Sequence, residues 1–251
     1  MLLEIFKDSI EYAYKDPRSI LKFGILLLLS IFIIPIFFVT GYYYRITEIG
    51  LKGTINGEDP LPKFEKLSKM FVQGFKVLLV RFIYLIPGTL VYLIPHKTPY
   101  GMVSMPSIPF LSIEFGILSL SAILWIVFYL FSSVAITNMI NNNGSLRSAF
   151  EFKEIIDIIN SIGILRYIKF YFGCIILAIG ILGAVFGIIL LITGVILFVI
   201  WAGTSFNSLL YVFGGFIGGL FSFIALLFLI PFFLAFEGRA IALLYNMREI
   251  D

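Results

Sequence analysis

The feature that most constrains this chain is a long stretch without a charged side chain. Between Phe170 and Phe236 the sequence contains no Asp, Glu, Lys, Arg or His, and it consists mainly of Ile, Leu, Phe, Val and Gly. A water-soluble domain of this size cannot cover so much apolar surface. Because lipid cannot hydrogen-bond a free backbone, the stretch predicts membrane-spanning helices.

The whole chain has the same character. It is 60% hydrophobic and 13% charged, whereas typical soluble proteins carry about 25% charged residues. We therefore expect an all-α, polytopic transmembrane bundle of about five to six membrane segments, with amphipathic interfacial helices. Residues 1–251 should form one integral domain, located as a multi-pass protein in the cell membrane.

Hydropathy and periodicity divide the chain into these segments. Residues 1–16 predict an amphipathic N-terminal helix, followed by Asp16 as an N-cap and Pro17 at the first position of the next helix. Two further amphipathic stretches predict interfacial helices at 61–71 and 145–162. The predicted membrane segments are 20–46, 72–95, 111–140, 165–201 and 212–238.

The first membrane segment has two interpretations. Residues 20–46 are long enough for one span kinked at Pro35, with the tyrosines before Arg45 forming an interfacial belt. Alternatively, the segment is a hairpin broken at Pro35 that dips into the bilayer and returns. We favour the single span on length.

The distribution of Lys and Arg predicts the orientation. Residues 45–81 carry seven such side chains and 139–169 carry four, whereas 95–112 carry one. The positive-inside rule places the first two regions on the cytoplasmic side and 95–112 on the opposite side. Residues 1–22 also carry four, and a single crossing at 20–46 would place them on the wrong side.

The basic side chains near the predicted interfaces are candidates for contact with anionic lipid headgroups, because long cationic side chains near helix ends reach toward the headgroup region. The candidate lipid-facing residues are Arg45, Lys63, Lys66, Lys69, Lys76 and Arg81. For the basic amphipathic stretch at 61–71, the alternative is binding to a groove on a partner protein.

The sequence offers no set of residues for catalysis. It contains no phosphate-binding Walker loop, no H-E-x-x-H and no G-x-S-x-G, and its only His and Cys are His96 and Cys174. One His and one Cys do not make a usual zinc site. We expect no enzymatic activity, no cofactor, no metal and no nucleic-acid partner. Membrane lipids are the expected partners, and the protein partner considered is a second copy of the chain.

The order "long span, amphipathic helix, span" occurs twice. Lys22-Phe23-Gly24 matches Glu114-Phe115-Gly116, Phe64 then corresponds to Phe152, and Arg81 corresponds to Lys169. These matches predict a weak internal repeat whose two units run in the same direction.

Several short motifs in the first half carry a resemblance to a known family. They are Gly41-Tyr42 with Arg45, Leu61-Pro62 with Phe64, Gly74-Phe75-Lys76, and Tyr84 with Pro87. Together they resemble an archaeal family of multi-spanning membrane proteins, the domain of unknown function 4013 family, over nearly the whole chain. The resemblance implies a multi-helix membrane protein without assigned activity, and it supplies no catalytic residue.

Two functions are consistent with these observations. The first is a non-enzymatic membrane protein that organises lipid or binds partner proteins. The alternative is a small transporter or exporter component built on the weak repeat. A polar cavity between spans, lined by Asn138, Thr40 or Ser132, would favour transport, whereas a dry, glycine-packed interior would favour the first function.

Overall fold

The computed structural model describes residues 1–93, 113–203 and 208–249. Loop 95–112, assigned above to the side opposite the cytoplasm, lies outside these residues. The described residues are predominantly helical and contain no strand, which confirms the all-α prediction. The helices are α1 Leu2–Tyr14, α2 Pro17–Leu29, η1 Ser30–Phe32, α3 Ile34–Lys52, α4 Leu67–Tyr92, α5 Ile113–Asn141, η3 Arg147–Phe150, α6 Phe152–Ile162, α7 Ile164–Gly203, α8 Ser208–Asn246 and η4 Met247–Glu249.

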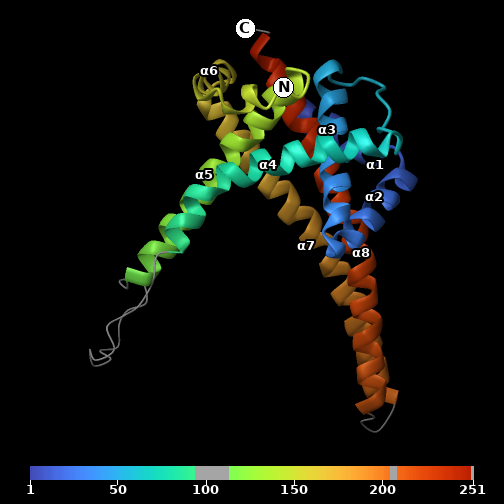
Figure 1. The fold of residues 1–251 in the computed structure, drawn as a ribbon. Coiled ribbons are helices and arrows are strands. Elements are labelled where there is room, and N and C mark those ends of the chain that lie inside the picture. Colours follow the sequence, from blue (N-terminus) through green and yellow to red (C-terminus); the bar gives the residue numbers. More distant parts are fainter. Residues whose placement is uncertain (94–112, 204–207, 250–251) are drawn as a thin grey trace.

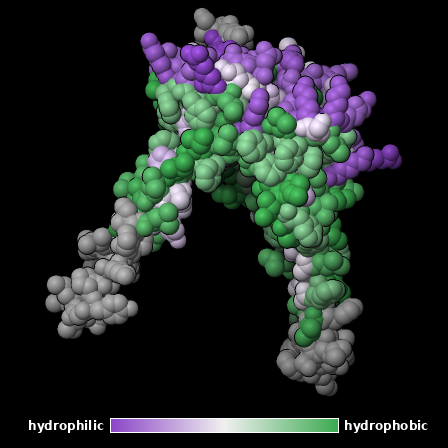
Figure 2. All heavy atoms as spheres, in the orientation of Figure 1, coloured by the Kyte–Doolittle hydropathy of each residue, from purple (hydrophilic) through white to green (hydrophobic). Residues whose placement is uncertain are grey.

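The helices form two arms that diverge from a common end (Figure 1). We call this end the cap; it comprises α1, the loop 53–66, α6 and the last turns of α8. One arm is the antiparallel pair α4 and α5, and the other is the antiparallel pair α7 and α8. Each of these four helices is long and apolar enough to cross a membrane. Figure 2 shows hydrophilic side chains gathered over the cap and hydrophobic ones over the arms.

The first membrane segment does not form the single helix that we favoured. The chain runs down α2, turns through η1, and returns along α3, which packs against α2 (Figure 1). Pro35 does not kink a continuous helix; it lies in the first turn of α3, where its missing N–H is not needed. The hairpin leaves α1 and its basic residues at the same end as the loop 53–66, which removes the conflict in the charge distribution.

The N-terminus of α2 follows the sequence prediction. The Asp16 side chain accepts a hydrogen bond from the backbone N–H of Arg18, and Pro17 occupies the first turn. The Asp16 side chain satisfies a backbone donor that the helix leaves free. It therefore fixes the residue at which α2 begins and the hairpin leaves the cap.

Neither predicted interfacial helix forms as expected, and no separate helix covers 61–71. Residues 61–66 are an irregular loop, because Pro60 and Pro62 disfavour helical backbone in the residues before them; α4 begins only at Leu67. The stretch 145–162 divides into η3 and α6, with a non-helical backbone at Glu151 between them.

The tyrosines before Arg45 do not form an interfacial belt. Tyr42, Tyr43 and Tyr44 are all buried, because α3 is an inner helix that packs against α2, α4 and α8. Tyr42 stacks on Phe64 from the loop 53–66 with the ring centroids 4.3 Å apart. The aromatic cluster therefore joins α3 to the cap and is part of the core.

Helices α3 and α4 approach so closely that they require glycine at the contact. A Cβ on Gly74 would collide with the backbone carbonyl of Phe37, and a Cβ on Gly41 would collide with that of Met70. The Thr40 hydroxyl donates to the Gly74 carbonyl oxygen at 3.1 Å across the same contact. Close packing around small residues with a side-chain hydrogen bond is the usual way in which membrane helices associate.

This contact generates a prediction about stability. We expect Gly74→Ala to lower the free energy of unfolding by about 1 to 3 kcal/mol, because the new methyl group forces two backbones apart. The matched control is Gly183→Ala in α7, where no atom lies within 4 Å of the added Cβ. The midpoint of thermal unfolding in detergent should fall by several degrees for Gly74→Ala and stay level or rise for the control. Equal effects would contradict the close contact.

The hairpin generates a prediction about topology. In a Cys174→Ser background, single cysteines replacing Lys7, Ser68 and Ser145 should all have the same accessibility to a membrane-impermeant thiol reagent, because all three positions are exposed at the cap end. A cysteine replacing Ser107 serves as the control for the opposite side. If the cysteine at position 7 labels together with that at position 107, residues 17–52 cross the membrane once.

Candidate functional site

Charged and hydroxyl side chains from three helices meet where the two arms join. We call Arg81, Tyr129, Ser132, Ser133 and Glu237 the apex cluster. The Arg81 guanidinium on α4 donates to the hydroxyls of Ser132 at 3.1 Å and Ser133 at 3.3 Å, both on α5. It also lies over the Tyr129 ring, 4.2 Å from its centroid, and the Tyr129 hydroxyl donates to Glu237 on α8 at 2.8 Å.

Helix geometry explains how α5 presents its part of this cluster. Ser132 and Ser133 follow Tyr129 by three and four residues, so the three side chains lie on one face of the helix. Both serine hydroxyls also donate to the Tyr129 carbonyl oxygen, at 2.7 and 3.1 Å. These bonds satisfy the hydroxyl protons within the helix and leave their oxygens free to accept from Arg81.

Two tyrosines of α7 complete the junction. The Tyr167 hydroxyl donates to the Leu130 carbonyl oxygen of α5 at 2.8 Å, and the Tyr167 and Tyr171 rings meet edge to face. The Tyr171 hydroxyl is buried and makes no hydrogen bond to the described residues. The hydrogen bond from Tyr167 to Leu130 thus couples α7 to α5, and the ring contact between Tyr167 and Tyr171 lies within α7.

A groove runs from the apex cluster along the inner faces of α5 and α7. Its volume is about 520 Å³, and its walls are almost wholly apolar. Trp125, Ile126 and Tyr129 form one wall, and Ile168, Tyr171 and Phe172 form the other. Of these side chains, Ile126, Ile168 and Phe172 are more than half exposed. We call the space between the diverging arms the arch (Figure 2).

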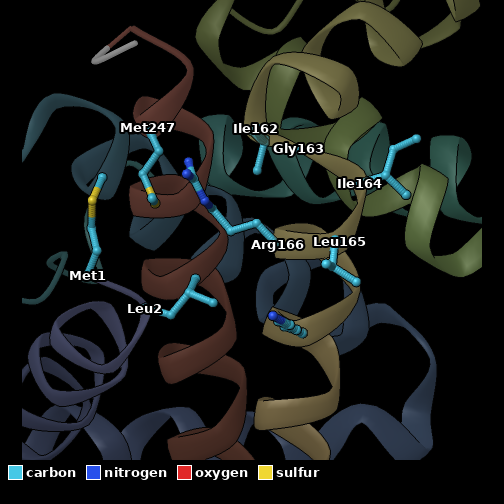
Figure 3. A pocket seen from close by; sticks show the side chains of 9 residues that line it. Met1, Leu2, Ile162, Gly163, Ile164, Leu165, Arg166 and Met247 are labelled. Carbon is cyan, nitrogen blue, oxygen red and sulfur yellow. The ribbon is translucent and has the colours of Figure 1, made fainter.

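A second hollow of about 560 Å³ lies near the cap, where α7 begins (Figure 3). Arg166 and Lys169 contribute its cationic side chains, and Figure 3 shows Arg166 reaching from α7 toward Met247. Leu165 and Ile164 give it an apolar wall on the same helix. A hollow lined by both cationic and apolar side chains suits the interface between headgroups and acyl chains.

A buried ion network lies in the cap on the other side of α8. Arg239 is fully buried; its Nε donates to Asp8 at 2.9 Å and its Nη1 to Asp59 at 2.8 Å. Its Nη2 donates to the Thr54 carbonyl oxygen at 3.1 Å, and its guanidinium lies 5.0 Å from the Tyr12 ring centroid. All three guanidinium nitrogens therefore have acceptors, as a buried arginine requires.

Sequence reasoning did not find this network. The spacing of Asp8 places it on the polar face of the N-terminal helix. Arg239 comes directly after the last apolar segment, where a basic residue that anchors the helix at the interface is common. Asp8 also accepts from the backbone N–H of Asn56 at 2.6 Å, so it connects α1 to both the loop 53–66 and α8. No local pattern signals partners that lie so far apart in the chain.

The six predicted lipid-facing residues fall into two groups. Lys63, Lys66 and Lys69 are exposed. The other three make hydrogen bonds within the protein. Arg45 donates to Gln73 and to the backbone carbonyls of Lys63, Glu65 and Lys66; Lys76 donates to the Gly144 carbonyl at 2.7 Å; Arg81 belongs to the apex cluster.

Within the described part of the chain, no group of three or more His, Cys, Asp and Glu side chains could hold a metal ion. The fold and these sites place the chain in the class of polytopic, all-α membrane proteins. It belongs to the family described as "Protein of unknown function (DUF4013)", whose sequence profile matches residues 25–192, about two thirds of the chain. No curated protein and no solved structure matches it.

The ion network generates a prediction about stability. Removing one partner of a buried ion pair leaves the other charge buried and alone, so we expect Arg239→Met to lower the free energy of unfolding by about 3 to 5 kcal/mol. The matched control is Arg147→Met, which breaks an exposed pair with Glu151 and should cost less than about 1 kcal/mol. Chemical denaturation in detergent would measure both.

A double variant separates the network from a general packing defect. Adding Asp8→Asn to Arg239→Met removes the more deeply buried of the two stranded carboxylates, so the double variant should be less destabilised than the sum of the two single variants. Strict additivity of the two changes would contradict the coupling.

Proposed function

We propose that the protein is a non-enzymatic, lipid-organising integral membrane protein of the cell membrane, which holds the acyl chains of membrane lipids in its arch. The observation that carries the proposal is the pair of apolar walls that face each other across the arch without touching. Ile126 on α5 and Phe172 on α7 are 62% and 65% exposed, although both lie on the inner faces of the arms. In a membrane, acyl chains would fill this space.

The apex cluster supports the same function. Arg81 and Glu237 carry opposite charges, and Tyr129 lies between them. The two charges at the junction therefore balance each other within the protein. A lipid in the arch would then have its chains against apolar walls and its polar end near the cap. Charged groups at membrane depth are costly unless they are paired in this way.

Cationic side chains around the cap support a preference for anionic headgroups. Lys63, Lys66 and Lys69 are exposed on one side of the cap, and Arg166 and Lys169 line the hollow on another. Each Lys or Arg near an anionic membrane surface contributes about 1 kcal/mol of attraction. We expect the cap to lie at the anionic surface and the arms to extend into the lipid.

The transporter alternative has less support. Asn138 is fully buried and bonded to Tyr245 and to the Ser148 carbonyl; Thr40 bonds to carbonyls of α3 and α4. Both side chains find hydrogen-bond partners within the packed protein. The proposed repeat also has unequal halves, because 20–46 contains parts of the two helices α2 and α3, whereas the described part of 111–140 lies within α5 alone.

Trp125 provides a natural reporter for the test, because it lines the groove. In a Trp201→Phe variant reconstituted into vesicles, lipids with brominated acyl chains should quench Trp125 fluorescence strongly. When only an anionic lipid is brominated, quenching should exceed that from the same fraction of a brominated zwitterionic lipid, because the cap concentrates anionic lipid around the protein. Strong quenching would indicate direct contact between Trp125 and the acyl chains, since bromine quenches over a short range.

The matched control fills the groove. Phe172→Trp cannot serve, because it adds a second reporter, so we use Ile126→Phe, which occupies space beside Trp125 and should weaken the quenching. Absence of bromine quenching in the Trp201→Phe protein would mean that the arms close on each other or on another protein, and the proposal would fail. Equal quenching by both lipid classes would remove the anionic preference alone.

A further inference from the structure

We propose that the α2–α3 hairpin is a re-entrant lipid-binding wedge, which inserts its tip among the acyl chains of the leaflet next to the cap and returns without crossing. This inference is independent of the lipid site in the arch. It assigns an interaction surface to a part of the chain that neither arm contains. Its partner is the hydrocarbon of one leaflet.

The tip is an exposed apolar segment. Four successive side chains are exposed: Ile31 by 80%, Phe32 by 73%, Ile33 by 72% and Ile34 by 63%. Turns in water are normally made from Gly, Asn, Asp, Ser or Pro. These four bulky apolar side chains do not pack against another part of the protein. Such a turn is suited to an apolar solvent.

The backbone of the turn is a second feature of the tip. Ile33 has φ 66° and ψ −55°, a conformation that L-residues rarely adopt and that is most costly for a β-branched side chain. Glycine at this position would relieve the strain. The isoleucine instead adds an apolar side chain to the tip at the cost of this backbone conformation.

The turn satisfies part of its polar groups internally. The Ser30 hydroxyl donates to the Leu26 carbonyl oxygen at 3.1 Å, the Ile33 N–H donates to the Ser30 carbonyl, and the Ile36 N–H donates to the Ile33 carbonyl. An exposed loop with free N–H and carbonyl groups would not enter hydrocarbon. Here the Ser30 side chain and the 3₁₀ turn satisfy several of these groups, which lowers the cost of placing the tip in lipid.

The base of the hairpin is polar, and one side of it is fixed to the protein. A hydrogen bond from the Ser19 hydroxyl lowers the pKa of the Asp16 carboxyl, which therefore stays charged at neutral pH, beside the exposed Arg18. Further along α2, Gly24 packs directly against the backbone of Leu227 on α8, and Phe23 packs on Tyr42. The hairpin is thus held against α8, with its polar base at the cap.

Length sets the depth of insertion. Helix α2 has 13 residues, and at about 1.5 Å per residue it extends about 20 Å. The hydrocarbon core of a bilayer is about 30 Å thick. A hairpin that starts among the headgroups at Asp16 therefore reaches the middle of the membrane and stops short of the far surface, and Figure 1 shows its turn well above the far end of α7 and α8.

The test places a single fluorophore at the tip. In a Trp125→Phe, Trp201→Phe background, we replace Phe32 by Trp and reconstitute the protein into vesicles whose lipids carry bromine either near the headgroup end or near the methyl end of the chain. We expect quenching at position 32 to be at least twofold stronger with bromine near the methyl end. Aqueous iodide should not quench it.

The matched control is Tyr14→Trp in the same background, because Tyr14 is an exposed aromatic residue of α1 in the cap. Iodide should quench this position, and bromine near the methyl end should not. Ile31→Trp is a second tip reporter if Phe32→Trp does not fold, and it should behave like position 32.

Two outcomes would overturn the wedge. Iodide quenching of the tip, without bromine quenching, would place it in water. Reaction of a Lys7→Cys variant, made in a Cys174→Ser background, with an impermeant reagent only from the side opposite that of a Ser68→Cys variant would show that the segment crosses the bilayer. Neither outcome depends on the arch, since Trp125 is absent from the quenching protein and the arch test leaves the tip unchanged.

Discussion

Arg239 is a fully buried guanidinium, and its partners determine how the cap is assembled. Water cannot solvate this guanidinium, because it lies among packed side chains. Its charge must therefore be balanced by Asp8 and Asp59. These carboxylates come from α1 and from the loop 53–66, while Arg239 is on α8. Three segments that are far apart in the chain therefore reach the same point or leave a buried charge unpaired.

The arms and the hairpin depend on this junction. Helix α8 leaves the cap at Arg239, runs beside α7 as one arm, and supports α2 through the contact between Gly24 and Leu227. Helix α3 packs on α8 and, through Gly41 and Gly74, on α4, so it transmits the position of the cap to the other arm. A large displacement of Arg239 would loosen the connections of both arms at once.

Composition predicts much of this architecture, because lipid permits few backbone arrangements. The charge-free stretch, the N-cap at Asp16 and the helical class all follow from local sequence. The hairpin was harder to predict, because Pro35 fits a kink and a first helical turn equally well. The four basic residues before position 23 were the signal that favoured the hairpin, because a single crossing would separate them from the other basic regions.

The candidate sites were less predictable than the fold, because their members are distant in sequence. Arg81 reads as a side chain that reaches toward headgroups, and nothing near it in the chain signals Ser132, Ser133 or Tyr129. The same holds for Asp8, whose spacing fits a polar helix face. Periodicity shows which side of a helix is polar, but not whether that side meets water or a buried charge.

The junction of α5 and α7 beside the apex cluster also accounts for the divergence of the arms. Direct polar contact between α5 and α7 occurs at Tyr167, close to the cap, and the groove begins immediately below it. In water the exposed walls would close together to bury apolar surface, but in lipid that driving force is absent, because hydrocarbon solvates them equally well. The polar contacts at the junction can therefore hold the arms apart, and the arch is stable only in the solvent for which its surface is built.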